Sequence, residues 1–487
     1  MSRFLALRLL GVCLLAQLAG CASSGHSDGS GGSPGSGGSP GSGGSTGSGG
    51  STGGSAAGGS RGSGSGGAPN AAGGTGNVTP GSGGDATGGR GGAAGAPTGT
   101  GGVSATGGAA GAATALTIPG AGHCAAPAGA KLADAQAAYA KWTADLVTSD
   151  GAGGFLRVKR PNSSGTEVNS TVSEGIGYAM LLAVYANDQA SFDKFWKYAN
   201  LWLDGNGLMN WYINAAGTQA LGTGAASDGD EDMAFALVMA DARWGGQGSL
   251  STTYLAAAKK VIDAMWQHEV DHARNNVLTP GDQFADGSVI NISYFAPAYY
   301  RVFARVSGNT GWNQTVDTTY TVLAATLNAQ NGNASNGLVP AWSTPAGVPM
   351  APAGTGDPTY HQLDSCRTPF RIGEDYCWNA DPRALTHLQK ITSFYAGVTV
   401  AAMVDGYDLN GNPHAQFVTG TGPRAASFVG GAGVGAMATG STYAQLRDDA
   451  YASVATLEDL AGSLYYQKSW TALSLQMMTG LLRDLTM

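Results

Sequence analysis

The chain has 487 residues, 80 of them glycine, and its net charge is −8 at neutral pH. Residues 21–120 hold 39 of these glycines and no aromatic residue, so this stretch cannot bury enough apolar surface to offset the entropy lost on folding. The acidic balance excludes nucleic acid and anionic lipid surfaces as expected partners, because both are bound by basic patches.

The N-terminus has the pattern of an export signal. Arg3 and Arg8 precede an apolar run that is too short to span a membrane as a stable helix. The ending Leu18-Ala19-Gly20-Cys21 resembles the lipobox of bacterial lipoproteins. This resemblance implies cleavage before Cys21 and a lipid anchor on that cysteine, with an ordinary secretory signal as the alternative.

These features predict three segments along the chain. Residues 1–20 are a lipoprotein signal peptide, residues 21–120 a Gly/Ser-rich disordered linker, and residues 121–487 the folded domain. We expect an exported monomer on the outer membrane or cell surface that contacts the membrane only through its lipid anchor. Without lipidation it would be secreted.

The folded domain shows apolar residues at the helical period, separated by loops rich in Gly, Asn and Pro. Period-2 alternation is scarce, and several segments, such as GYAMLLAVY, are apolar nearly all round, which is typical of helices covered on both faces. Eleven or twelve helices indicate an all-α fold of stacked hairpins, either a solenoid or a closed toroid. Helices are expected to begin near Lys131, Glu174, Ala190, Asp228, Thr252, Tyr294, Trp312, Pro382, Arg424, Tyr443 and Tyr466.

Three cysteines follow Cys21. Export permits disulfides, and Cys366 and Cys377 are close enough in sequence to close a local loop. Cys124 is then expected to be free. The chain has no Cys-x-x-Cys pair, so a zinc ribbon or a redox motif is not indicated.

Two acidic segments precede apolar helices. Glu174 lies between small residues, where apolar walls would raise the pKa of its carboxyl for general acid work; the alternative is a residue that only complements the helix dipole. The segment Ala226–Met233 holds four carboxylates within five residues, more than capping needs. A calcium loop fails, because its glycine and bidentate glutamate positions are occupied by Met233 and Met239. The remaining interpretation is a carboxylate cluster at the floor of a sugar cleft.

Two further segments carry chemistry-bearing residues. His268-Glu-Val-Asp-His272 matches the zincin pattern formally, but no third ligand follows at the expected spacing, so solvated histidines are favoured. Asp364 is followed by Arg367 and Arg371, an arrangement that keeps a carboxylate ionised and suits a general base. A buried structural ion pair explains that arrangement equally well.

Six segments, taken in this order, resemble glycoside hydrolase family 8. The resemblance covers most of residues 130–485 and implies an (α/α)6 barrel, a double-layered helical toroid with an open cleft across one end. It also implies hydrolysis of β-1,4 glycosidic bonds with inversion, without a metal or organic cofactor. The segments are SEGIGYAMLLAVYANDQASFDKFW, GLMNWYI, AASDGDEDMAFALVMADARWG, GDQF, NISYFAPAYYRVFA and DSCRTPFRIGEDYCW.

Matched residue by residue, the resemblance implies Glu174 as general acid, Asp364 as general base and Asp228 as the residue that holds the sugar at the cleavage subsite. Phe284 stands where family members often have Trp, and Leu363 where they often have Tyr, so substrate preference stays open. The residues expected to bind substrate are Trp211, Phe284, Tyr294, Arg367 and Arg371.

Three classes of function follow. The first is an endo-β-1,4-glucanase acting on a β-1,4-linked polysaccharide, with a chitosanase or a mixed-linkage glucanase of the same family as alternatives. The second is a non-catalytic polysaccharide-binding module. The third is a zinc metallopeptidase that uses His268 and His272.

Overall fold

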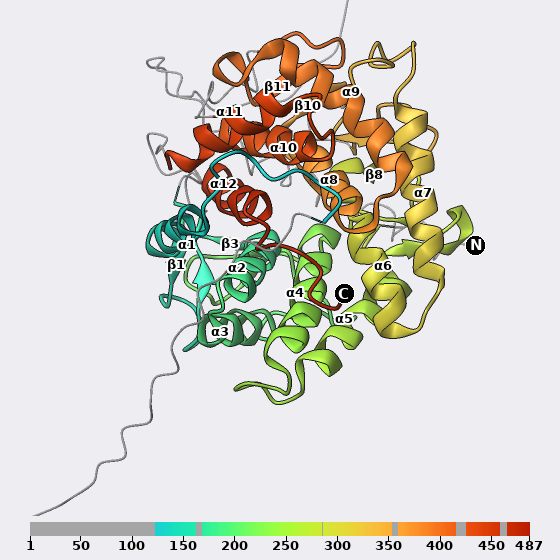
Figure 1. Cartoon of the computed structure of the whole chain (residues 1–487). Coiled ribbons are helices and arrows are strands. Elements are labelled where there is room, and N and C mark those ends of the chain that lie inside the picture. Colours follow the sequence, from blue (N-terminus) through green and yellow to red (C-terminus); the bar gives the residue numbers. More distant parts are fainter. Residues whose placement is uncertain (1–121, 162–167, 285, 353–358, 415–424, 458–464) are drawn as a thin grey trace, which may run out of the picture. The chain divides into compact units, whose positions relative to one another are not determined.

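The computed structural model describes residues 122–161, 168–284, 286–352, 359–414, 425–457 and 465–487 (Figure 1). The predictions for residues 1–121, including the signal peptide, the anchor at Cys21 and the linker, lie outside these residues. Among the described residues, none of the helices combines the length and hydropathy that a membrane span requires.

Helices dominate the described part of the chain, which confirms the prediction of a helix-rich domain with eleven or twelve helices. The helices are α1 (Leu132–Leu146), α2 (Ser173–Tyr185), α3 (Gln189–Ala199), α4 (Ser227–Trp244), α5 (Tyr254–His268), α6 (Pro297–Ser307), α7 (Gly311–Thr326), α8 (Arg367–Asn379), α9 (Pro382–Val398), α10 (Ala426–Met437), α11 (Ala444–Ala455) and α12 (Tyr465–Met478).

Short antiparallel strands of two or three residues join some of these helices. They pair as β1–β2, β3–β4–β5, β6–β7, β8–β9 and β10–β11. The strands are β1 (Val147–Thr148), β2 (Arg157–Val158), β3 (Thr171–Val172), β4 (Tyr212–Ile213), β5 (Ala220–Gly222), β6 (Val270–Asp271), β7 (Val277–Leu278), β8 (Ile290–Asn291), β9 (Trp342–Ser343), β10 (Tyr360–Gln362) and β11 (Gly406–Asp408).

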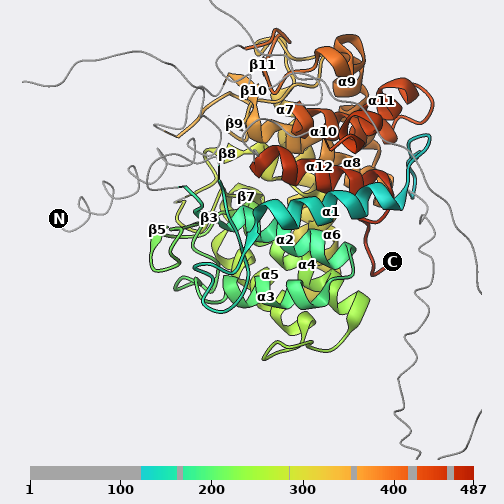
Figure 2. The same ribbon diagram turned by 90° about the vertical axis from the view of Figure 1, so that its left-hand side faces the viewer.

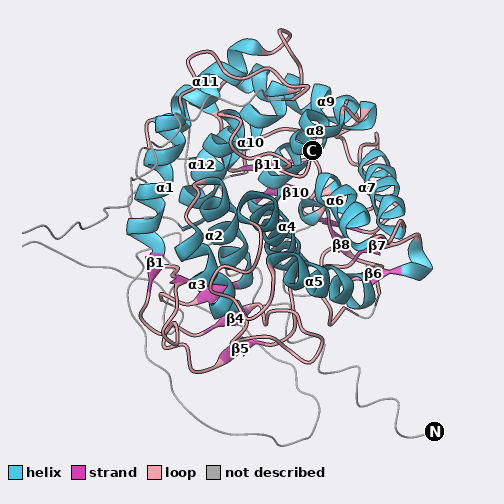
Figure 3. Ribbon diagram, turned by 60° about the horizontal axis from the view of Figure 1, so that its bottom comes forward, coloured by secondary structure: helices cyan, strands magenta, loops and turns pink. Residues whose placement is uncertain are grey.

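The even-numbered helices pack against one another in a closed circuit. Each of α2, α4, α6, α8, α10 and α12 contacts the next, and α12 contacts α2. The odd-numbered helices each pack against one or two members of this circuit and lie at the periphery in Figure 3.

Burial explains why the inner helices are apolar nearly all round. In α2 every residue except Glu174 is buried, and all twelve residues of α10 are buried, because neighbours cover both sides of these helices. Two glycines let α2 and α4 approach closely. A Cβ on Gly177 would lie 2.7 Å from Cβ of Asp232, and one on Gly229 would lie 2.7 Å from Oγ of Ser173.

The short strands gather at one end of the helices, as Figure 2 shows. β3 leads directly into α2, and β10 leads into α8 through the 3-10 turn η5 (Leu363–Cys366). In the same way β8 leads towards α6 through η4 (Ile292–Tyr294). The N-terminal ends of these inner helices therefore lie at this end, where the first turn of each helix has free backbone N–H groups.

The expected helix starts match eleven of the twelve helices to within a few residues, but they miss α8. This segment carries Pro369, Gly373 and several charged residues, so its apolar period is weak. Pro369 fits the helix because it occupies the first turn, where no intrahelical N–H partner is needed. Asp381 caps α9 as the sequence predicts, accepting a hydrogen bond from the backbone N–H of Arg383 at 2.9 Å.

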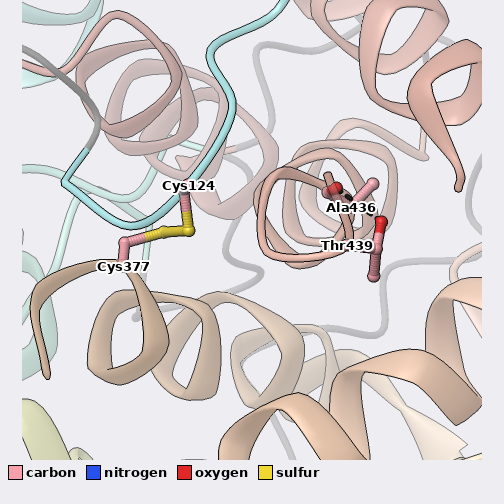
Figure 4. Close-up of a disulfide and its surroundings, with 4 residues drawn as sticks. All are labelled: Cys124, Cys377, Ala436 and Thr439. Carbon is pink, nitrogen blue, oxygen red and sulfur yellow. Dashed lines mark hydrogen bonds between the residues drawn. A yellow bond between two sulfur atoms is a disulfide. The ribbon is translucent and has the colours of Figure 1, made fainter. Parts of the chain in front are cut away.

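The predicted disulfide pairing is wrong. Cys124 bonds to Cys377 (Figure 4). Cys366 is a buried free thiol. Cys366 immediately precedes α8 and Cys377 lies near the end of that helix, so the helical rise separates them by about 16 Å, beyond the reach of a disulfide. The bond instead fastens the first described residues to the far end of α8, where the backbone N–H of His123 also donates to the carbonyl of Cys377 at 2.9 Å.

We expect this disulfide to stabilise the domain by about 2–5 kcal/mol, since it closes a loop between residues 253 positions apart. Thermal unfolding with and without a reductant measures the effect. Reductant should lower the Tm of the wild type and leave the Tm of Cys124→Ser unchanged.

The matched control is Cys366→Ser, which keeps the Cys124–Cys377 bond. Its Tm should remain sensitive to reductant. Sensitivity that is lost in Cys366→Ser and retained in Cys124→Ser would contradict the pairing.

Candidate active site

One buried arginine joins three carboxylates from distant parts of the chain. Nη1 of Arg367 lies 2.5 Å from Oδ2 of Asp228. Nη2 lies 3.0 Å from both Oε2 of Glu174 and Oδ1 of Asp364. Because these two carboxylates share one nitrogen, their nearest oxygens lie within twice that distance of each other. The structure thus brings together the predicted acid, the predicted base and the predicted sugar-holding residue.

The fold places each of these groups at the start of an inner helix. Glu174 is the second residue of α2 and Asp228 the second residue of α4. Asp364 lies in η5, three residues before Arg367 opens α8. The helix dipole and the free N–H groups of the first turn favour carboxylates at such positions, and Gly229 N–H donates to Asp228 at 2.9 Å.

Two carboxylates of the cluster are accessible to a ligand, and the other two residues are buried beneath them. The side chains of Asp364 and Glu174 are 31% and 13% exposed. Asp228 and Arg367 lie beneath them, 5% and 2% exposed. A ligand that approaches this end of the helices therefore meets Asp364 and Glu174 first.

Burial dominates the electrostatics of Glu174 and raises the pKa of its carboxyl to about 7. The positive charge of Arg367 opposes this rise, and the negative charges of Asp228 and Asp364 add to it. Burial also raises the pKa of Asp228, against the attraction of Arg367. Glu174 can consequently hold a proton near neutral pH, as a general acid must.

The three predicted aromatic residues lie in different surroundings. Tyr294, in η4, has its ring 5.2 Å from the guanidinium carbon of Arg367 and is 4% exposed. Trp211 is 5% exposed and stacks on Tyr212, and its carbonyl accepts from Ser173 N–H at the start of α2. Phe284 is partly exposed in the loop that follows β7.

Sequence reasoning missed the direct partners of the acid and the base. The hydroxyl of Tyr465, at the start of α12, donates to Oε1 of Glu174 at 2.7 Å. Nδ2 of Asn291 donates to Oδ2 of Asp364 at 3.3 Å. Asn291 opens a segment that carries the family resemblance, NISYFAPAYYRVFA, and Tyr465 adjoins the expected helix start at Tyr466, but no local pattern indicates which carboxylate each one meets.

Arg371, which the sequence predicts to contact the substrate, lies deeper in the protein than the reachable carboxylates. It is 1% exposed, and its nitrogens bind Asp232 at 2.5 Å and the hydroxyl of Tyr299 at 2.7 Å. Arg371 follows Arg367 by four residues on α8, and Asp232 follows Asp228 by four residues on α4. The two residues therefore form a second ion pair between these helices, one helical turn further inside. We therefore assign Arg371 to the interior rather than to the substrate-binding surface.

The remaining carboxylates of α4 have separate partners. Asp230 accepts from Met209 N–H at 3.3 Å, and Glu231 accepts from the hydroxyl of Tyr300 at 3.1 Å. Of the four acidic residues in this segment, only Asp228 joins Glu174 and Asp364. The others lie inside the helical circuit.

The H-E-x-x-H match does not form a zincin helix. α5 ends at His268, Glu269 is buried behind it, and His272 follows in a 3-10 turn with its Nδ1 2.9 Å from Oδ1 of Asn276. In the part of the chain that the structure describes, no three side chains of His, Cys, Asp or Glu are arranged to hold a metal ion. Because α5 ends at His268 and His272 lies in a separate turn, the two histidines do not share one helical face.

Comparisons with known proteins point to one family. Residues 119–480 match the family described as glycosyl hydrolases family 8. "Endoglucanase A" of Acetivibrio thermocellus is 39% identical over 304 residues, which are 61% of this chain and 60% of that protein. "Endoglucanase 2" of Ruminiclostridium josui is 36% identical over 346 residues, 70% of each chain.

Solved structures agree with this assignment. The apo structure of a β-1,3-1,4-glucanase from Paenibacillus sp. X4 superimposes with a TM-score of 0.65 at 28% identity, covering 73% of this chain and 95% of that one. The exo-oligoxylanase Rex8A from Paenibacillus barcinonensis shares the fold, with a TM-score of 0.59 at 19% identity.

The raised pKa of Glu174 predicts a pH-dependent gain in stability for Glu174→Gln. In the wild type, the stability that protonated Glu174 contributes is fully present below its pKa in the unfolded state, near 4.5. This contribution is lost as pH rises through its pKa in the folded state, about 7. Glutamine does not ionise, so the variant escapes this loss. Its free energy of unfolding, relative to the wild type, should increase by ~1–3 kcal/mol between pH 4.5 and pH 8.

Urea unfolding of both proteins at several pH values measures this difference. A difference that stays constant or shrinks as pH rises would show that Glu174 has no raised pKa in the folded state.

Proposed function

Since this chain belongs to glycosyl hydrolase family 8, we propose that it is an exported endo-β-1,4-glucanase that inverts the anomeric configuration. One observation carries the proposal. Glu174 and Asp364, the two carboxylates of the site that a ligand can reach, both bind the same nitrogen of Arg367. Most glycoside hydrolases act through two carboxyl groups that flank the scissile bond.

In the proposed reaction Glu174 donates its proton to the glycosidic oxygen as the bond to the anomeric carbon breaks. Asp364 takes a proton from a water molecule whose oxygen attacks that carbon from the opposite face. Contacts with the arginine and Asn291 hold the Asp364 carboxylate in place for this task. The carboxyl groups are roughly 6.5–9.5 Å apart in inverting enzymes and about 5–5.5 Å apart in retaining ones. The limit of twice 3.0 Å set by the shared nitrogen applies only to the nearest oxygens and does not choose between these classes, so inversion is proposed from the family resemblance.

Asp228 is proposed to hydrogen-bond the sugar whose anomeric carbon reacts. Its Oδ2 is taken up by Arg367 and its Oδ1 by Gly229 N–H, so the carboxylate is held rigidly below the reacting groups. Among the predicted aromatic residues, Phe284 is the most exposed and therefore the best placed to stack on a sugar face. Tyr294 and Trp211 would contact the sugar at their edges.

We further infer that the twelve helices form the (α/α)6 barrel expected of this family. The closed contact circuit of α2, α4, α6, α8, α10 and α12, with one odd-numbered helix beside each, supports this architecture. It also accounts for a site at the N-terminal ends of the inner helices.

A mixed-linkage β-glucan is the second candidate substrate. The support is the likeness to the β-1,3-1,4-glucanase structure, which this chain covers over 95% of that protein's length. Chitosan stays a third candidate within the family, because an acidic protein attracts a cationic polymer.

We also propose export as a lipoprotein with its lipid on Cys21, and a monomeric domain carried on the Gly/Ser-rich linker of residues 21–120. A flexible linker of this length has a root-mean-square span of roughly 50–60 Å. Such a linker would let an anchored domain reach polysaccharide at some distance from the cell surface.

Glu174→Gln and Asp364→Asn should each lower kcat by about 10²–10⁴-fold with little change in substrate binding, since each removes one proton-transfer group. Reducing-sugar release from carboxymethylcellulose, lichenan, xylan and chitosan measures the effect and ranks the substrates. ¹H NMR of the first products should show the α-anomer, as inversion at a β-linkage demands.

Asp317→Asn is the matched control, because Asp317 is an exposed carboxylate on α7 and is 58% exposed. Its turnover should equal that of the wild type. Near-normal turnover in Glu174→Gln would refute Glu174 as the general acid. Binding of polysaccharide without hydrolysis by the wild type would refute the proposed enzyme and leave a polysaccharide-binding module.

Lipidation can be tested separately from activity. A bacterial host fed an alkyne-tagged fatty acid should label the wild-type protein and should not label Cys21→Ser. Without its lipid the variant should leave the membrane fraction. Equal labelling of both proteins, or labelling of neither, would contradict the proposed anchor.

A further inference from the structure

The two oxygens of the Glu174 carboxyl meet two chemically different partners. Oε2 faces Nη2 of Arg367 at 3.0 Å, and Oε1 faces the hydroxyl of Tyr465 at 2.7 Å. A guanidinium can only donate hydrogen bonds, whereas a phenolic hydroxyl can donate or accept. The two oxygens are consequently not equivalent as places for a proton.

Protonation of Oε2 would weaken the bond that this oxygen accepts from Arg367, while protonation of Oε1 leaves that bond intact. On Oε1 the proton also finds an acceptor, because the Tyr465 hydroxyl can turn its own hydrogen away. We propose that Tyr465 is a positioning residue that holds the Glu174 proton on Oε1 before cleavage and then stabilises the carboxylate by donating to the same oxygen. This inference rests on the proposed function.

The proton balance of one turnover is simple under this proposal. The proton moves from Oε1 to the glycosidic oxygen, which keeps the electron pair of the broken bond. The water that attacks the anomeric carbon gives its proton to Asp364. Glu174 is left ionised, Tyr465 turns its hydrogen towards Oε1, and solvent restores the starting protonation of both carboxyls.

Packing holds the Tyr465 hydroxyl beside Glu174 whether the carboxyl is protonated or ionised. Tyr465 is 2% exposed, and its ring stacks on Tyr178 with centroids 6.4 Å apart. The residue after the acid is Gly175, and a Cβ at that position would lie 3.0 Å from the Tyr465 hydroxyl oxygen. The glycine after Glu174 thus leaves the space that the Tyr465 hydroxyl occupies, which explains why a residue without a side chain stands at position 175.

Electrostatics agrees with this geometry. The hydrogen bond from Tyr465 lowers the pKa of Glu174 against the rise caused by burial, because it favours the ionised carboxylate. Removing the hydroxyl should therefore raise the pKa of Glu174 further and slow proton release. Strengthening the hydroxyl as a donor should do the opposite.

The test compares two variants at position 465 by the pH dependence of kcat on the best glucan substrate. Tyr465→Phe should lower kcat about 10-fold or more, leave KM nearly unchanged, and move the alkaline limb to higher pH, since hydrogen bonds to charged groups contribute this much. Tyr465→3-fluorotyrosine keeps the ring and makes the hydroxyl a stronger donor. It should move the alkaline limb to lower pH.

Tyr451→Phe is the matched control. Its hydroxyl also donates to a carboxylate, that of Asp134, but this pair joins α11 to α1 away from the site. This variant should keep the wild-type kcat and pH profile even if its Tm falls. Circular dichroism and Tm establish that all variants are folded.

Alkaline limbs that stay at the wild-type pH in both position-465 variants would overturn the proposal, as would shifts in the same direction. If Tyr465→Phe does not fold, the direction of the 3-fluorotyrosine shift decides alone. A wild-type protein that releases no reducing sugar from any glucan would instead defeat the proposed function. The two failures are therefore distinguishable.

Discussion

The buried guanidinium of Arg367 is the constraint on which the site depends. A charge that is only 2% exposed needs partners, and three carboxylates supply them from α2, α4 and the turn before α8. The arginine and the carboxylates stabilise one another. The arginine draws together residues separated by up to 190 positions in sequence, and the carboxylates remain close to one another only because the positive charge lies between them.

The fold makes this meeting possible by bringing the N-terminal ends of the inner helices to one end of the circuit. Glycines at the α2–α4 contact let those two helices approach, and a second Arg–Asp pair one turn deeper fixes the relation between α4 and α8. The Cys124–Cys377 bond fastens the opposite end of α8 to the first residues of the domain. The helix that begins with Arg367 is thereby held at both ends, and the site is built on rigid elements.

Local patterns in the sequence predicted most of the helices and the residues that meet at the site, and the reasons for the failures are physical. Apolar periodicity missed α8, because this inner helix carries the two arginines and a proline. Spacing suggested a Cys366–Cys377 loop, but a helix between two cysteines keeps them apart. Arg371 resembles Arg367 in sequence and is equally buried, and only its partners, Asp232 and Tyr299, distinguish it from the arginine at the site. The contact of Tyr465 with Glu174 joins residues 291 positions apart, and no local pattern encodes such a contact.

We propose that Glu174 and Asp364 act from two sides on one glycosidic bond above Arg367. The most direct measurement is a crystal structure of Glu174→Gln with a bound cello-oligosaccharide that spans the site. In this complex the scissile oxygen should lie within hydrogen-bond distance of the side chain at position 174, and a water molecule should lie between Asp364 and the anomeric carbon. A sugar chain bound away from both side chains, or a carboxylate of Asp364 turned from the anomeric carbon with no water between, would contradict it.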